Sequence, residues 1–296
     1  MSCNQCPRKC NKERQEDVVS SYGYCQVSVR PKVARAALHF WEEPCISGEE
    51  GSGTVFFSGC NLRCVYCQNV EIAAGVRGKE ISIERLAKIF LELQEKGANN
   101  INLVTPSHYY MQIKAALLLI KDKLHIPVIA NTSSYDSVEV LREMEGLIDI
   151  YLADFKYRNR ELAAKYSHAA DYPQVAAEAL KEMFRQVGEP EFDNRGMLKK
   201  GMIIRHLLLP GCKEDSKAVL KYLYETFGGS VFISIMNQYT PLSQVEKYPE
   251  LNRKIEEEEY EEVVDYAIEL GIENGFVQEG ETAEDSFIPA FDGEGV

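Results

Sequence analysis

Three of the nine cysteines in this sequence of 296 residues lie close together, and their spacing could do chemistry. Cys60, Cys64 and Cys67 are separated by three residues and then by two. Thiolates bind soft metals and iron–sulfur clusters. Three of them could hold three irons of a [4Fe–4S] cube and leave the fourth iron open, as a catalytic zinc keeps one open position. A zinc site with a distant fourth ligand is the alternative, but no second Cys-x2-Cys pair follows Cys67.

A second set of cysteines lies near the N-terminus and could close a metal site completely. It consists of Cys3, Cys6, Cys10 and Cys25, with Cys45 as a fifth thiol further along. Structural zinc and a [4Fe–4S] cluster both suit four thiols, and the spacing does not decide between them. Residues 1–35 carry seven Lys and Arg against three Asp and Glu, so they could accept an acidic electron donor such as a flavodoxin or a ferredoxin.

Composition and charge exclude several classes of protein. Hydrophobic residues make up 45% of the chain, but no apolar run reaches the roughly 18 residues that a membrane span needs. The start lacks the apolar stretch of a secretory signal, so we expect a cytoplasmic protein with reduced thiols. The net charge of −13 lies in residues 253–296, where 15 acidic residues face 2 basic ones in an acidic helix and tail. Residues 1–252 are neutral, so no nucleic-acid partner is expected.

The elements that position these residues have the pattern of a parallel sheet. From residue 54 onward, β-rich runs alternate with segments of helical periodicity. Strands are expected at 54–58, 101–105, 127–131, 149–155, 202–209 and 231–236, and helices at 81–96, 109–124, 136–145, 173–187, after 213 and at 256–270. Such alternation predicts parallel strands, and six are too few for a closed eight-stranded barrel.

We therefore predict an α/β fold: a partial (β/α)6 TIM-like barrel in residues 51–296. Residues 1–50 lack clear periodicity and are predicted to form a cysteine-rich, metal-binding N-terminal extension. Functional side chains are expected at the carboxyl ends of the strands, because ligands bind there in sheets of this kind.

The stretch from Phe56 to Asn69, with Tyr66 just before the last cysteine, resembles the signature of the radical SAM superfamily. It is most similar to pyruvate formate-lyase activating enzymes, which act on glycyl radical enzymes, and residues 42–48 resemble a poorly characterised branch of them. The resemblance implies a [4Fe–4S] cluster on the three cysteines, with its open iron chelated by S-adenosylmethionine. Reductive cleavage of that cofactor would give a 5′-deoxyadenosyl radical that takes a hydrogen atom from the substrate.

The resemblance also implies cofactor contacts in the first strands of the barrel. Tyr66 would meet the adenine, or else it packs within the barrel. The family's usual Gly-Gly-Glu motif is replaced here by a stretch in which Thr105 and Ser107 could offer oxygens to the cofactor's ammonium. His108, which follows, is either a donor in the pocket or a helix-start residue. Asn131 stands where the family often has an aspartate that helps to bind a cation.

Charged residues on the later strands complete the implied site. In the family, an acid in the position of Asp154 helps to hold a small cation, and a lysine in the position of Lys156 pairs with the cofactor's carboxylate. An internal Asp154–Lys156 ion pair is the alternative. Arg205 resembles an arginine that reaches the cofactor, and a buried arginine is costly unless it is paired. Residues 237–239 are candidate substrate contacts.

These residues favour an enzyme that generates a 5′-deoxyadenosyl radical. Its substrate would be a glycyl radical enzyme, or else a peptide, another protein side chain or a small molecule. The alternative from another class is a non-catalytic iron–sulfur electron carrier. A carrier would have a saturated cluster and no need for Asp154, Lys156 or Arg205, whereas the three-cysteine loop leaves one iron open.

Overall fold

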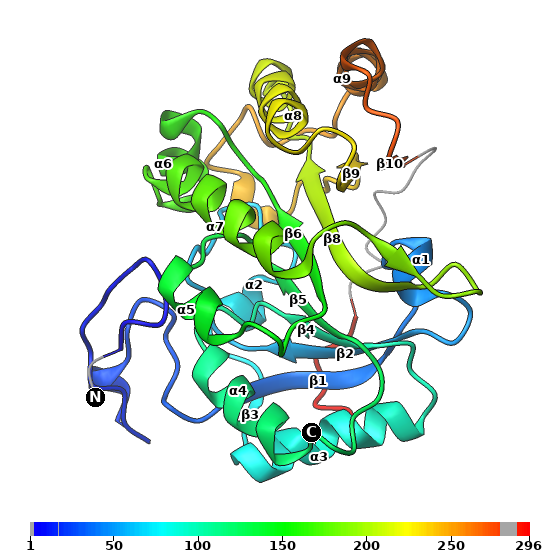
Figure 1. The fold of residues 1–296 in the computed structure, drawn as a ribbon. Coiled ribbons are helices and arrows are strands. Elements are labelled where there is room, and N and C mark those ends of the chain that lie inside the picture. The colour runs from blue at the N-terminus through cyan, green and yellow to red at the C-terminus, as the bar shows by residue number, and fades with distance from the viewer. Residues whose placement is uncertain (1–2, 17, 279–288) are drawn as a thin grey trace.

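A computed structural model describes residues 3–16, 18–278 and 289–296, which fold around one curved sheet (Figure 1). The strands are β1 (Lys32–His39), β2 (Ser52–Phe57), β3 (Lys79–Glu80), β4 (Ile101–Val104), β5 (Val128–Thr132), β6 (Ile150–Asp154), β7 (Glu191–Phe192), β8 (Leu198–Leu207), β9 (Phe232–Met236) and β10 (Gly275–Val277). The α-helices are α1 (Pro44–Ser47), α2 (Val70–Ala73), α3 (Ile83–Glu95), α4 (Tyr110–Leu119), α5 (Val138–Glu143), α6 (Arg160–Ser167), α7 (Tyr172–Val187), α8 (Lys213–Phe227) and α9 (Glu257–Leu270). Short 3-10 helices span Val19–Ser21 and Ser243–Val245.

The strand order is β10-β9-β8-β6-β5-β4-β2-β1-β3, and β7 pairs with β8 outside this path. All neighbours from β2 to β10 run parallel, whereas β1 is antiparallel to both β2 and β3. Among the described strands, the two ends of this order do not pair with each other, so the barrel is open. The predicted partial α/β barrel is confirmed, and the six strands expected from the sequence form its parallel centre.

Alternate residues of the central strands pack on opposite faces, as the pleat of a strand requires. On β6, Tyr151 and Ala153 belong to the main core that contains the apolar sides of the long helices. Their neighbours Ile150 and Leu152 belong to a smaller cluster around Ile46 of α1. The helix α1 therefore lies inside the curve of the sheet, while the long helices cover its outside.

Strand β1 was not expected from the sequence, because residues 1–50 were predicted as an extension without regular structure. The strand lies between β2 and β3 in the sheet and pairs with β2 from Val33 opposite Phe57 to His39 opposite Ser52. A register shift between Val33 and Arg35 interrupts the pairing, and buried residues occur in adjacent pairs instead of alternating. This irregularity hides the two-residue period by which a strand is found in a sequence.

The C-terminal part of the chain confirms one prediction and adds one strand. The predicted acidic helix is α9, whose first turn carries Glu257, Glu258 and Glu259. Strand β10 was missed because three residues are too few to show a period. Residues 279–288 of the predicted acidic tail lie outside the described residues. Within the described chain, each helix is too short or too polar to cross a membrane.

The packing of α1 leads to a stability prediction. Ile46 is fully buried among strand residues of the inner face, so Ile46→Ala leaves a cavity that the rigid sheet cannot close. We expect the free energy of unfolding, measured by urea titration, to fall by about 2–5 kcal/mol. Val76→Ala, at a site 72% exposed, is the control and should change it by less than about 0.5 kcal/mol. Equal effects of the two substitutions would contradict the burial of α1.

Candidate functional site

A cavity of about 670 Å³ lies on the inner face of the sheet, at the carboxyl ends of the parallel strands. It is also lined by the segment that leads from β1 into α1 and by β10. All nine residues selected from the sequence line it: Cys60, Cys64, Cys67, Tyr66, Thr105, Asn131, Asp154, Lys156 and Arg205. The tertiary structure thus brings the nine together, while their roles stay predictions.

The cysteine loop is held in place by its backbone and by its neighbours. Gly59 has a φ of +88°, and a Cβ at this position would lie 2.6 Å from the carbonyl oxygen of Cys25, so only glycine fits. The fully buried Asn61 donates a hydrogen bond from its amide nitrogen to the carbonyl of Tyr135 at 2.7 Å. Arg8 donates to the carbonyl of Asn61, also at 2.7 Å, and joins the N-terminal segment to the loop.

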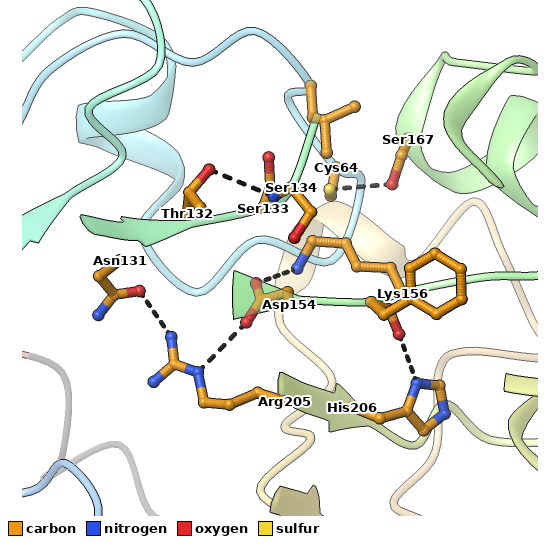
Figure 2. Close-up of polar contacts among 12 residues, drawn as sticks. Cys64, Asn131, Thr132, Ser133, Ser134, Asp154, Lys156, Ser167, Arg205 and His206 are labelled. Atoms are coloured by element: carbon orange, nitrogen blue, oxygen red, sulfur yellow. Dashed lines mark hydrogen bonds and ion pairs between the residues drawn. The ribbon is translucent and has the colours of Figure 1, made fainter. Parts of the chain in front are cut away.

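The three sulfurs have the chemistry that a metal cluster needs. The Cys60 sulfur lies 3.3 Å from the backbone N–H of Leu62, and the Cys64 sulfur accepts a hydrogen bond from the Ser167 hydroxyl at 2.9 Å (Figure 2). Burial raises the pKa of Cys64 and raises that of Cys67 to about 12. Buried thiols of this kind ionise when metal cations are bound to them. The donor set therefore fits a thiolate-bound cluster.

Asp154 lies between two cations at the end of β6 (Figure 2). Its Oδ2 atom is 2.7 Å from Nζ of Lys156, and its Oδ1 atom is 3.3 Å from Nε of Arg205. Burial would raise the pKa of Asp154, but Lys156 and Arg205 lower it more, so the carboxylate stays charged. The internal Asp154–Lys156 pair, which was the alternative from the sequence, is therefore present in this structure.

Arg205 extends this network to a residue that the sequence analysis did not select. Its Nη1 atom lies 2.9 Å from Oε2 of Glu42, and its Nη2 atom donates to the side-chain oxygen of Asn131 at 2.6 Å. The other oxygen of Glu42 accepts from the amides of Asn102, at 3.0 Å, and Asn131, at 3.2 Å. Glu42 belongs to the stretch 42–48 noted in the sequence, and the need of a buried arginine for carboxylates was the signal that could have identified it.

Tyr66 packs in the core as one interpretation from the sequence expected, while its contact with an adenine stays a prediction. It is 7% exposed and packs in the core, yet it also lines the cavity. Its hydroxyl accepts a hydrogen bond from Tyr157 at 2.7 Å, and the Tyr157 hydroxyl lies 2.9 Å from that of Ser167. The Ser167 hydroxyl also contacts the Cys64 sulfur, so these polar contacts link the position of Tyr66 to the cysteine loop.

Thr105, directly after β4, has a strained backbone conformation. Its φ is +59°, a left-handed backbone that is unfavourable for a β-branched residue. The backbone N–H of Thr105 donates to the carbonyl of Asn131 at 2.9 Å, which holds the turn against the next strand. Strain of this kind is concentrated at binding sites, where the surrounding structure can impose it.

Two other polar candidates on this turn are structural. Ser107 is buried, and its hydroxyl lies 3.3 Å from that of Thr132. His108 is 1% exposed, its Nε2 atom lies 2.8 Å from the carbonyl oxygen of Ser58, and burial lowers its pKa to about 3. Neither residue lines the cavity, so the interpretation of His108 as a helix-start residue is correct and that of a donor in the pocket is wrong. Of the candidate substrate contacts at 237–239, Gln238 lines the cavity.

The four N-terminal cysteines lie near one another. Cys6 and Cys25 are buried, and Cys10 accepts a hydrogen bond from the N–H of Tyr24 at 3.3 Å. Burial raises the pKa of Cys6 to about 12, and the charges of Cys25, Cys3 and Cys10 add to this rise. Among the described residues, no three or more His, Cys, Asp or Glu side chains are arranged around a single metal ion, whereas in an iron–sulfur cluster each iron takes one thiolate. The second metal site stays a prediction.

Comparison with known proteins identifies relatives of this chain. Residues 54–194 match the family model of the radical SAM superfamily. An uncharacterized protein of Methanocaldococcus jannaschii, MJ0674, is 28% identical over 279 residues, which are 90% of this chain and 74% of that protein. The crystal structure of Streptococcus suis SuiB bound to its precursor peptide SuiA matches with a TM-score of 0.50 and 15% identity over 74% of this chain. This chain covers 46% of SuiB, about half its length, and the likeness is one of fold.

A buried acid lies behind the cavity wall, beside the carboxyl end of β5. Asp136 is 2% exposed, and its Oδ2 atom accepts a hydrogen bond from the Thr132 hydroxyl at 2.5 Å. Its Oδ1 atom has no hydrogen-bond partner in the described part of the chain. Burial raises the pKa of Asp136 to about 6, although the hydroxyls of Ser107 and Thr132 lower it in part. The folded protein therefore binds a proton at Asp136 more tightly than the unfolded chain does.

The raised pKa of Asp136 predicts a loss of stability as the pH rises. Its contribution is complete below the ordinary aspartate pKa of 3.8 and is lost by about pH 6, because charging a buried carboxyl is costly. Asp136→Asn should remove this dependence of stability on pH. The free energy of unfolding of the variant, relative to that of wild type, should therefore rise by up to about 3 kcal/mol between pH 4 and pH 7. Urea titrations at pH 4, 5, 6 and 7 measure the difference. Asp122→Asn, at an exposed site, should show no such trend. A constant difference between Asp136→Asn and wild type would contradict the assignment.

Proposed function

We propose that this chain is a radical SAM enzyme whose cluster is bound by Cys60, Cys64 and Cys67, because residues 54–194 match the family model of the radical SAM superfamily. Membership of this superfamily implies a [4Fe–4S] cluster and S-adenosylmethionine as cofactors. When bound and reduced, the cluster supplies the electron that cleaves the cofactor to a 5′-deoxyadenosyl radical for hydrogen abstraction. The observation that carries the proposal is that these cysteines and Tyr66 of the same loop line one cavity together with five polar residues on or directly after the strands β4, β5, β6 and β8.

The chain's own residues hold the cofactor in this proposal. Lys156 and Arg205 donate to the carboxylate and ribose of S-adenosylmethionine, and Asp154 keeps both cations in place before it binds. The oxygens of Thr105 and Asn131 accept from its ammonium group. The Tyr66 ring meets the adenine, with its hydroxyl fixed by Tyr157. Because the cations are already paired, they enter the buried site without the full cost of an unpaired charge.

We further propose that the substrate is a protein or a peptide. SuiB, which shares the fold, binds a precursor peptide, and the cavity of about 670 Å³, lined in part by β10, has room for a segment of chain. A glycyl radical enzyme is the nearest such protein, and this finer assignment rests on the resemblance of residues 56–69 to pyruvate formate-lyase activating enzymes. Reduced thiols and an open iron, which oxygen would attack, favour the cytoplasm as the compartment.

For the N-terminal cysteines we propose a second metal site, either a [4Fe–4S] cluster or zinc. Residues 1–50 would then be a metal-binding extension of the barrel in 51–296 that shares strand β1 with its sheet. Arg8 binds this segment to the cysteine loop, and the exposed Lys9 and Lys12 offer a basic surface to an acidic donor such as a flavodoxin or ferredoxin. A cluster here would lie on the path of an electron toward the cavity.

Anaerobic turnover tests the proposed function. The protein is reconstituted with iron and sulfide, reduced with dithionite and given S-adenosylmethionine, and 5′-deoxyadenosine is measured by mass spectrometry. We expect product from wild type and loss to background in Cys64→Ala, because three thiolates are needed to hold the cluster. Cys212→Ala, which removes a thiol outside the cavity, should keep wild-type turnover. Equal amounts of 5′-deoxyadenosine from Cys64→Ala and wild type would contradict the proposal.

Metal analysis tests the N-terminal site separately. The variant in which Cys3, Cys6, Cys10 and Cys25 are all replaced by alanine should lose about four irons per chain if the site holds a cube, or one zinc if it is structural. The Cys64→Ala variant should keep this metal. Plasma emission spectrometry on protein purified without oxygen gives both numbers. Identical iron and zinc contents in wild type and the fourfold variant would refute the site.

A further inference from the structure

One buried carboxyl group in the cavity has an oxygen atom without a hydrogen-bond partner among the described residues. Glu43 lines the cavity and is 9% exposed, and its Oε2 atom has no hydrogen-bond partner in the described part of the chain. The carboxyl group of Glu43 forms a hydrogen bond with the side chain of Ser234 on β9. Leaving a buried carboxyl oxygen without a donor is costly, so such an atom usually meets a ligand, an ion or water.

The helix that follows does not use this side chain. Glu43 precedes α1, and its backbone carbonyl accepts from the N–H groups of Ile46 at 2.7 Å and Ser47 at 3.1 Å. Its carboxylate, however, makes no capping hydrogen bond to the helix. The backbone thus fixes the position of Glu43, and its carboxylate lines the cavity without capping the helix.

The neighbouring charges do not neutralise Glu43. Among the described lining residues, Glu42, Glu43 and Asp154 are acidic, whereas Lys156 and Arg205 are the two permanent cations. Lys156 binds Asp154, and Arg205 directs Nε, Nη1 and Nη2 at Asp154, Glu42 and Asn131. Burial raises the pKa of Glu43, and although Arg205 lowers it, Glu42 raises it again. A further cation beside Glu43 would supply a donor to its unpartnered Oε2 atom.

The position of Glu43 separates it from the cysteine loop. Because β1 is antiparallel to β2, its last residue, His39, lies opposite Ser52 at the amino end of β2. The segment 40–44 therefore enters the inner face from the end opposite to the one where Cys60 follows β2. An amino group chelated at an open iron would belong to the cysteine end, whereas Glu43 enters from the other end and would be available to a cation of a second molecule.

We propose that Glu43 anchors an alkylammonium group of the substrate, so that the radical acts on a compound or side chain carrying a primary amine, such as lysine. Trp41 lines the same cavity two residues away, and indole rings attract cations. This inference deepens the proposed function and rests on it for the chemistry, but the binding of an amine at Glu43 can be measured without turnover.

Fragment binding tests this subsite directly. Full-length reconstituted protein at pH 7 is titrated with pentylammonium chloride and, separately, with 1-pentanol, and saturation-transfer NMR gives both dissociation constants. We expect wild type to bind pentylammonium at least tenfold more tightly than 1-pentanol. Glu43→Gln should reduce this preference to twofold or less. Glu49→Gln, which removes an exposed carboxylate from the loop that follows α1, should keep the wild-type preference.

Three outcomes overturn the inference. They are a wild type without preference for the amine, a Glu43→Gln variant that keeps the preference, and a Glu43→Gln variant that loses S-adenosylmethionine affinity, which would place the cofactor's own ammonium at Glu43. We expect S-adenosylmethionine affinity to change by less than twofold. The thermal midpoint of Glu43→Gln should equal or exceed that of wild type, and Glu43→Met provides a second neutral variant. If wild type forms 5′-deoxyadenosine but shows no preference for pentylammonium, this subsite alone is refuted. If wild type prefers pentylammonium but forms no 5′-deoxyadenosine, the result counts against the proposed function.

Discussion

A buried guanidinium group sets the arrangement of the whole site. Arg205 has a side chain only 14% exposed, and an arginine cannot escape the cost of burial by losing its proton. It therefore needs carboxylates close by, and the fold supplies Asp154 from the neighbouring strand β6 and Glu42 from the segment before α1. To bring Glu42 there, the chain must turn back from strand β1 into the inner face of the sheet. The position of α1 and the floor of the cavity follow from this one requirement.

The cysteine loop depends on a second constraint, which is close contact with the N-terminal segment. Gly59 packs against the backbone of Cys25, and Arg8 donates to the loop at Asn61. The guanidinium of Arg8 also lies 4.1 Å from the centre of the Tyr24 ring, whose hydroxyl donates to the carbonyl of Leu62. The two sets of cysteines are thus parts of one packed unit.

The cavity keeps features that a stable core would not retain. Thr105 has a left-handed backbone, Glu43 has an unpartnered carboxyl oxygen, and Asp136 is a buried acid behind the wall. Each lowers the stability of the protein, and all three lie in or beside the same cavity. Their concentration there fits a site shaped for a bound molecule, because the ligand can supply the missing donor or cation.

The sequence by itself determined the chemistry of the loop and the parallel centre of the sheet. Cysteine spacing is a local pattern, and strands and helices have their own periods of hydrophobic residues, so both can be identified from the amino-acid sequence alone. The sequence also placed nine residues at strand ends that the fold brings into one cavity. The tertiary structure alone decided the partners: Glu42 and Glu43 lie more than 100 residues from Asp154 and Arg205, and a bulge hides the strand β1 that leads to them. Electrostatic pairing across such distances follows from burial, and burial is a property of the packed chain.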